Sequence, residues 1–416
     1  MQTFIIKKSN FFFTIIFFIG FSNLQAQEKK IDHSKIKKDL YQILNDISQY
    51  YAYVNDKNID LNCLLNYYEA QIPKIKTEEE TVLFFEYLLD EFYDSHVMLN
   101  TNRNSSYRLN SPIYFSLKNG KPIISNIWQS QIEDLEQQLI GTELLKFNGN
   151  DINEVIAEFP THCNDKNDPE VKEWIINKIV AGRYNEPRLL TLKREDKKII
   201  ELDLDEIKLK NNTGLLSAKV ENGIGIIRLN NSLGNNDLVS EFDAMLDTLL
   251  DTKGLILDLR NTVGGGNSYV ARGIMGRFVN EKKPYQTHQV FEKYDGSSLV
   301  ERSWVEYVSP RNKIYQKPVV VLVGRWTGSM GEGMAVGFEG MGRGEIVGSE
   351  MQRLAGEMTG TSFKHQTYGY RLSIAKLYHV NGTLREKYIP TNYIAQTTTK
   401  KDEVLEKGIE LLTTGN

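Results

Sequence analysis

Residues 317–349 read KPVVVLVGRWTGSMGEGMAVGFEGMGRGEIVGS, and this stretch decides the expected fold class. The apolar run 319–323 predicts a buried strand, which a glycine-rich turn follows. Ser329 then opens a segment with helical spacing, and residues 344–348 predict the next strand. A serine at a strand–turn–helix junction lies beside free helix N–H groups, as a nucleophile requires, but serine is also a frequent helix N-cap. Taken alone, the stretch favours the N-cap interpretation.

The same alternation of strands and helices surrounds this stretch from residue 215 onward. Apolar runs at 224–229 and 254–259 predict strands, and amphipathic spacing predicts helices over 235–250 and 268–278. Apolar strands separated by helices indicate an α/β core with a parallel sheet covered on both faces. Active sites of such sheets lie at the carboxyl ends of the strands, where both Gly264-Gly265-Gly266 and Ser329 are expected.

The preceding part of the chain has a different pattern. Residues 32–103 show helical periodicity, with a possible capping box at Thr77 and Glu80. Residues 105–208 are strand-rich, with a hairpin turn predicted at Asn119-Gly120. A chain of 416 residues exceeds one ordinary core, so we expect an α+β protein of two or three domains.

Composition limits the classes of partner. The chain is 40% hydrophobic and 25% charged, as in folded globular proteins, and its formal net charge of −4 gives no reason to expect nucleic acid or an anionic membrane. Lys7 and Lys8 precede an apolar run at 11–21, and Ala26 closes the segment. This pattern is typical of a cleaved signal peptide, since the run is shorter than the ~20 residues of a membrane span. We therefore expect a periplasmic or secreted protein with no stable membrane insertion after cleavage.

The two cysteines, Cys63 and Cys163, leave two interpretations open. Export implies an oxidising compartment, in which they could form one bridge. Because they fall in segments predicted to belong to different domains, we favour two buried free thiols.

Several kinds of site are disfavoured by spacing. The glycine cluster lacks the last glycine of G-x-G-x-x-G, and no phosphate-binding G-x-x-x-x-G-K-[ST] occurs, so we expect no nucleotide cofactor. Thr327 replaces the first glycine of the G-x-S-x-G elbow, which disfavours the esterase and lipase fold. No H-E-x-x-H or cysteine–histidine spacing predicts a metal site. A glycine N–H near a substrate carbonyl is the better interpretation of 264–266, with a plain tight turn as its alternative.

Four motifs in order resemble the tail-specific (C-terminal-processing) serine proteases. They are GLILDLRNTVGGG at 254–266, the serine–glutamate spacing of Ser329 and Glu332, Tyr93-Asp-Ser-His96, and GTELLKFNGNDI at 141–152, which is similar to the core of the family's PDZ-like domain. After the signal peptide that the N-terminal pattern predicts at 1–26, the resemblance implies a helical region at 27–104, a PDZ-like domain at 105–208 and a Clp-protease/crotonase-like α/β catalytic core at 209–416.

The resemblance also implies the site residues. Residues 351–356 lack the lysine of the family's serine–lysine branch, and Lys364 is a poor positional match, so the chain looks like the tricorn-like, histidine-using branch. Residues 351–364 are expected to form a loop. In that branch Ser329 is the nucleophile, His96 its general base with Ser95 as a polar neighbour, and Glu386 acts through the network that holds the imidazole. Gly264 or Gly265 and Met330 would donate N–H groups to the oxyanion, and Glu332 would brace the motif.

These expectations give an exported serine endopeptidase that acts on protein or peptide substrates and uses no cofactor or metal. The alternatives are an inactive peptide-binding homologue and a non-peptidase acyl hydrolase with the same site. The usual glycine-rich loop of a PDZ-like domain is replaced here by Ile113-Tyr-Phe-Ser-Leu117, so binding of substrate C-termini is open. The sequence does not indicate an oligomeric state.

Overall fold

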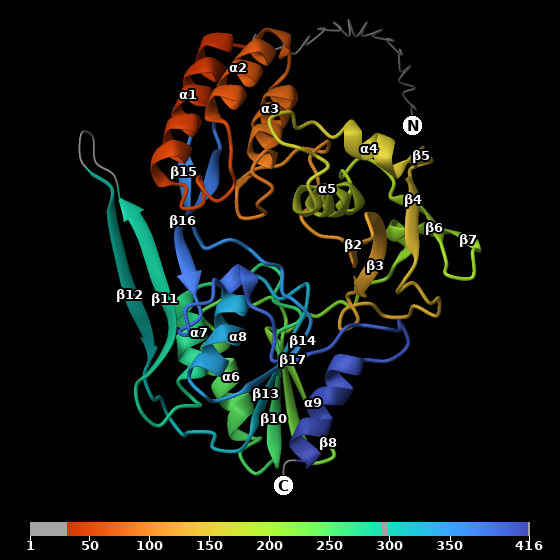
Figure 1. Ribbon diagram of the computed structural model, residues 1–416. Coiled ribbons are helices and arrows are strands. Elements are labelled where there is room, and N and C mark those ends of the chain that lie inside the picture. The colour runs from red at the N-terminus through yellow and green to blue at the C-terminus, as the bar shows by residue number, and fades with distance from the viewer. Residues whose placement is uncertain (1–30, 293–297, 415–416) are drawn as a thin grey trace, which may run out of the picture.

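Three β-sheets with their helices organise the computed structural model, which describes residues 31–292 and 298–414 (Figure 1). In Figure 1 the helical region lies above the central sheet, and the strand-rich region lies to the right of the helical region. The predicted signal peptide, residues 1–26, lies outside the described residues. Within the described part, no helix has the length and apolar character needed to cross a bilayer.

The central sheet has the order β17-β14-β13-β10-β9-β8, and its strands are parallel except for β8. Its strands are β8 (Leu216–Glu221), β9 (Ile224–Leu229), β10 (Gly254–Asp258), β13 (Val319–Val323), β14 (Glu345–Gly348) and β17 (Asn392–Tyr393). This confirms the predicted α/β core with a mostly parallel sheet.

Both faces of the central sheet are covered, which explains why β13 is apolar at every position. Val319, Val321 and Val323 pack towards α6 (Leu238–Asp247), α7 (Ser268–Met275) and α8 (Met330–Gly340). Val320 and Leu322 pack with Leu412 of α9 (Glu403–Thr414) on the opposite face. The strand therefore ends in a rigid, buried setting immediately before Ser329.

The helical region contains α1 (His33–Tyr50), α2 (Leu61–Gln71), η1 (Ile72–Lys74) and α3 (Glu78–Asp90). Thr77 and Glu80 form the expected capping box at the start of α3. The core of this region is completed from far along the chain by Phe363, Tyr370 and Leu372. The N-terminal helices therefore depend on residues near the other end of the sequence.

A second sheet of five strands, with the connection between its strands β15 and β16, supplies these distant residues. It has the order β1-β16-β11-β12, and β15 also pairs with β16. Its strands are β1 (Met98–Leu99), β11 (Lys283–Glu292), β12 (Val300–Val308), β15 (Glu357–Ser362) and β16 (Gly369–Tyr378). The expectation of a loop over 351–364 is therefore wrong for 357–362. This segment becomes a strand because β16 offers an antiparallel partner that a local pattern cannot reveal.

The third sheet, with helices α4 and α5, is called the β2–β7 module. Its order is β2-β3-β4-β6-β7, with β5 paired to β4. Its elements are β2 (Ile113–Lys118), β3 (Lys121–Ile127), β4 (Glu143–Phe147), β5 (Asn150–Asp151), α4 (Ile152–Ala157), α5 (Pro169–Ala181), β6 (Leu189–Lys193), β7 (Ile199–Asp203) and η2 (Leu204–Glu206). Asn119 and Gly120 both have positive φ, as a tight two-residue hairpin requires.

Cys63 and Cys163 form a disulfide, so the prediction of two free thiols is wrong. Their Cα atoms lie 5.8 Å apart because α2 meets the segment between α4 and α5 of the β2–β7 module. The Glu91 carboxylate accepts hydrogen bonds from the backbone N–H groups of His162 (2.7 Å) and Cys163 (3.0 Å), which holds this segment against the helical region. Residues in separate regions can thus be immediate neighbours.

Candidate active site

Ser329 begins α8 with an unusual backbone conformation. Its φ is 51° and its ψ is −111°, in a region that residues with a Cβ rarely adopt. Such strain costs on the order of 1–3 kcal/mol and persists only where the surroundings impose it. A sharp strand-to-helix turn of this kind exposes a serine hydroxyl, even though the G-x-S-x-G pattern is incomplete here.

Gly265 packs directly against Ser329. A Cβ at Gly265 would lie 2.4 Å from Ser329 Cβ, 2.9 Å from Ser329 Oγ and 3.1 Å from Met330 N. Gly265 also has φ +65°, so both space and backbone conformation require glycine. The glycine cluster at the end of β10 and the serine at the end of β13 therefore meet, as expected for carboxyl ends of adjacent parallel strands.

The predicted oxyanion donors differ in their hydrogen bonding. The Gly264 N–H donates to Asn231 Oδ1 at 2.6 Å, and the Gly265 N–H donates to the Thr262 carbonyl at 3.0 Å. Met330 supplies the first N–H of α8, and no acceptor in the described residues takes it. The structure therefore brings Gly265, Ser329 and Met330 together, while Asn231 occupies the Gly264 donor.

Glu332 lies one helical turn beyond Ser329 and is fully buried. One carboxylate oxygen accepts the Ser329 N–H at 2.8 Å and the other accepts the Arg353 N–H at 2.9 Å. Burial raises the pKa of Glu332 to about 7, although these two N–H donors favour the ionised form. Glu332 thus connects the serine turn to the segment that begins at Arg353.

His96 lies in the segment after α3, and its side chain is buried. Its backbone N–H donates to Asp94 Oδ1 at 2.9 Å. Its Nδ1 lies 2.9 Å from the Ala355 carbonyl oxygen, which can only accept, so Nδ1 carries the proton. Burial lowers the pKa of His96, which favours the neutral ring with an unprotonated Nε2. This is the tautomer that a general base requires.

The segment 353–356 connects the surroundings of His96 with those of Ser329. Arg353 N–H reaches Glu332, Ala355 accepts from His96, and Arg385 donates to the Gly356 carbonyl at 2.7 Å. His96 Nε2 is buried and has no hydrogen-bond partner within the described residues, so it is not bonded to Ser329 Oγ in this structure. The two predicted residues are linked through this segment rather than directly.

The other predicted polar residues have distinct surroundings. Glu386 lies in η3 (Arg385–Lys387), where burial raises the pKa of its carboxyl. The charges of Arg385 and Asp94 act on the pKa values of both Glu386 and His96. The hydrogen bond from His96 Nδ1 is accepted by the Ala355 carbonyl and not by Glu386. Ser95 is exposed, and its Oγ accepts from Trp174 Nε1 at 3.3 Å, so it faces α5.

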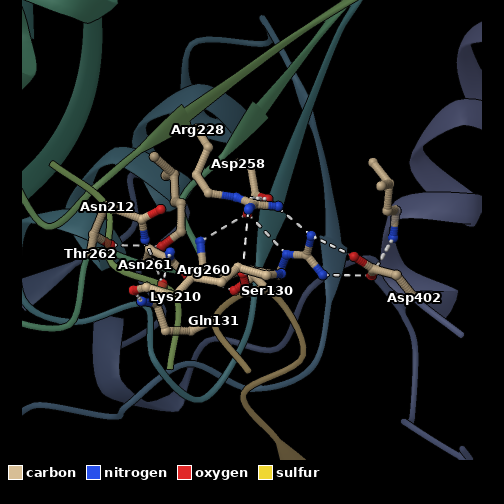
Figure 2. Close-up of polar contacts among 12 residues, drawn as sticks. Ser130, Gln131, Lys210, Asn212, Arg228, Asp258, Arg260, Asn261, Thr262 and Asp402 are labelled. Atoms are coloured by element: carbon tan, nitrogen blue, oxygen red, sulfur yellow. Dashed lines mark hydrogen bonds and ion pairs between the residues drawn. The ribbon is translucent and has the colours of Figure 1, made fainter. Parts of the chain in front are cut away.

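A polar network surrounds residues 258–262, which lie directly before the glycine segment in the chain (Figure 2). Arg260 forms ion pairs with Asp258 at 2.9 Å and with Asp402 at 2.6 Å, as Figure 2 shows. Burial opposes ionisation of Asp258, but Arg260 and Arg228 hold its pKa well below the usual range. Asn261 accepts from Ser130 Oγ at 2.6 Å, which ties the β2–β7 module to the strand end. The segment that carries Gly264 and Gly265 is thus fixed at its base.

Sequence reasoning missed three contributors. Ala355 acts through a backbone carbonyl, which leaves no side-chain signal. Asn231 and Arg385 could have been suspected as polar residues beside predicted strand ends or motifs, but neither stands in a distinctive spacing. Within residues 31–292 and 298–414, no group of three or more His, Cys, Asp or Glu side chains could hold a metal ion.

Comparisons with known proteins place part of this chain beside a peptidase family. Residues 223–394 match the model of peptidase family S41. The matched segment contains Gly265, Ser329 and Glu386, and His96 lies outside it. The match supports a serine-type peptidase. No curated protein matches the chain.

Solved structures share the fold over nearly the whole chain. Mature CPAF has a TM-score of 0.62 at 13% identity, over 92% of this chain and 96% of that one. The photosystem II D1 C-terminal processing protease has a TM-score of 0.53 at 13% identity, over 91% of this chain and 97% of that one. The chain therefore has the mixed α/β fold of the S41 proteases, and at such identities the likeness concerns the fold.

Proposed function

We propose that this chain is an exported serine endopeptidase in which Ser329 attacks a peptide carbonyl and His96 accepts the Ser329 proton. The observation that carries the proposal is the contact of Gly265 with Ser329, whose backbone is held in a strained conformation. Strain and close packing at this half-buried serine are costly, and a helix cap alone does not require them. They are the expected setting for a nucleophile at a strand end.

The proposed mechanism uses groups already described. His96 Nε2 takes the proton from Ser329 Oγ as this oxygen attacks the peptide carbonyl. The C–N bond then breaks, His96 gives the proton to the leaving amine, and the acyl-enzyme remains on Ser329 Oγ. Water, deprotonated by His96, attacks the ester and releases the acid and the free serine. The Met330 N–H, the first donor of α8, binds the oxyanion, and the Gly264 N–H joins it when the substrate oxygen replaces Asn231 Oδ1. Because His96 and Ser329 are not hydrogen-bonded in this structure, substrate binding must bring them together, with movement of segment 353–356.

We assign the chain to the histidine-using, tricorn-like branch as part of this proposal. The supporting observation is the position of Lys364, whose backbone N–H donates to Gln42 Oε1 of α1 and whose side chain is exposed. Glu386 is proposed to stabilise the buried surroundings of His96. We also propose that the β2–β7 module is PDZ-like.

Export is supported by the Cys63–Cys163 disulfide, since such bonds persist mainly in oxidising compartments. Cell fractionation tests this part of the proposal. Recovery of the native protein in the cytoplasm with both thiols reduced would contradict it.

A fluorophosphonate probe tests the nucleophile. Wild type should be labelled, Ser329→Ala should not, and Ser309→Ala, which changes an exposed serine, should behave as wild type. Absence of labelling in wild type would favour the inactive peptide-binding homologue. Turnover of matched peptide and ester substrates separates a peptidase from an acyl hydrolase, because hydrolysis of the ester alone would reject the peptidase.

A further inference from the structure

The β2 strand forms one end of its sheet in the described part of the chain, with β3 as its neighbour. An edge strand presents alternate backbone N–H and C=O groups to any strand that is added. Modules that capture extended peptides by strand addition use these groups for main-chain hydrogen bonds. Whether β2 can receive a substrate C-terminus therefore depends on where its outward backbone groups are already bonded.

Helix α5 already occupies these groups. The Phe115 N–H donates to Asn177 Oδ1 at 2.9 Å, and Asn177 Nδ2 donates to the Phe115 carbonyl at 2.8 Å. The Leu117 N–H donates to Glu173 Oε2 at 3.0 Å. The Asn177 amide thus makes the donor–acceptor pair that the backbone of an added strand would make.

The opposite edge of the sheet offers no better position for a carboxylate. It is the short strand β7, whose residues Glu201 and Asp203 carry negative charge. Acidic side chains at an edge discourage strand addition and repel a terminal carboxylate. Neither edge is therefore suited to binding the end of a substrate chain.

The same part of the module, around β2, also contacts the turn before Ser329, which contains Arg325 and Trp326. Arg325 lies 4.3 Å from the centre of the Tyr114 ring, and the Tyr114 hydroxyl donates to Glu173 Oε1 at 2.9 Å. Trp326 Nε1 donates to the Ser111 carbonyl at 2.9 Å. The Glu173 carboxylate therefore accepts hydrogen bonds both from the backbone of the β2 edge and from the hydroxyl of Tyr114, on whose ring Arg325 stacks.

We propose that α5 closes the β2–β7 module to strand addition and that Glu173 makes the module a fixed support for the turn before Ser329. The proposed peptidase consequently cleaves internal peptide segments whether or not the substrate has a free C-terminal carboxylate. The part of this inference that concerns the substrate rests on the proposed function. The closure of the module by α5 does not depend on that function. Glu173 is a positioning residue, since it acts through Tyr114 and Arg325.

Substrate chemistry gives the first test. An internally quenched peptide is prepared with a free and with an amidated C-terminus, both presented to the full mature chain. The two kcat/KM values should agree within about twofold, because no site recognises the carboxylate. A loss of tenfold or more on amidation would overturn the proposal.

Hydrogen exchange gives a test that does not need activity. In the full-length Ser329→Ala protein, the amides of Phe115 and Leu117 should exchange slowly, and an excess of free-carboxylate peptide should not change their rates. Fast exchange that becomes slow with this peptide, but not with its amidated form, would overturn the proposal. If neither peptide is cleaved by wild type, this measurement still decides closure, so failure of the proposed function remains distinguishable.

Variants of α5 test the positioning role. Glu173→Ala should lower kcat by tenfold or more with little change in KM, and Glu173→Gln, which keeps an acceptor, should recover most of it. Glu170→Ala alters an exposed carboxylate in the first turn of the same helix and should match wild type. Equal kcat in Glu173→Ala and Glu170→Ala, with both folded by circular dichroism, would reject the role of Glu173.

Discussion

Gly265 and Ser329 are in such close contact that a Cβ on the glycine would lie 2.4 Å from the serine Cβ. We expect Gly265→Ala to displace Ser329 and to lower kcat/KM by about a hundredfold, since misplacement of a reacting group by about 1 Å costs that much. Gly360→Ala is the matched control, because nothing lies within 4 Å of a Cβ there. Equal kcat/KM in both variants would show that the contact does not position the nucleophile.

Because the backbone at Ser329 is strained, we expect a substitution that relieves the strain to raise stability while it removes activity. Ser329→Gly should remove the strain of φ 51° and increase the free energy of unfolding by about 1 kcal/mol, after the greater flexibility of glycine in the unfolded chain is included. Ser329→Ala keeps a Cβ and should not stabilise the protein. Chemical denaturation compares the two inactive variants, and a less stable glycine variant would contradict the expectation.

The predictions from sequence were confirmed where a structural feature leaves a pattern in the neighbouring residues of the chain. The run Val319–Val323 is apolar throughout because both faces of β13 are covered, so the parallel core was predictable. The disulfide and β15 were not, because each depends on a partner distant in sequence. Ala355 was invisible for another reason, since its contribution comes from a carbonyl that every residue possesses.

The pH dependence of turnover should report His96. Burial lowers the pKa of this imidazole below its ordinary value near 6.5, and the neutral form is the proposed base. Activity should therefore persist below pH 6.5 and decline only as the pH falls through the lowered pKa. A kcat/KM profile measures this, and an acid limb centred above pH 7 would argue against His96 as the base.

Glu332 should make stability depend on pH in the opposite sense from an ordinary carboxylate. Because burial raises its folded pKa to about 7, its contribution is fully present below the unfolded pKa near 4.5 and is lost as the pH rises through 7. Relative to Glu332→Gln, wild type should lose up to about 3 kcal/mol between pH 4.5 and 8. Parallel unfolding curves of the two proteins at all pH values would refute the shift.

Removal of the Cys63–Cys163 bond should destabilise the folded chain. The bond joins residues 100 apart in sequence, and closing such a loop contributes about 2–5 kcal/mol. The double variant Cys63→Ser/Cys163→Ser should unfold at lower denaturant than oxidised wild type, and reduced wild type should resemble the variant. If reduction leaves the midpoint of wild type unchanged, the bond does not form in solution.

Tyr370 and Leu372 complete the core of the N-terminal helices but are among the later residues to be synthesised. The helices therefore lack part of their core until most of the chain has been made. The part of the chain that carries His96 leaves the ribosome early, yet its core and the Ala355 carbonyl that holds the imidazole arrive hundreds of residues later. An incomplete chain therefore possesses a histidine that nothing has yet positioned, even after Ser329 has been made. A chain ending at Glu350 should lose protease resistance in residues 33–90, and cleavage activity should depend on completion of the polypeptide.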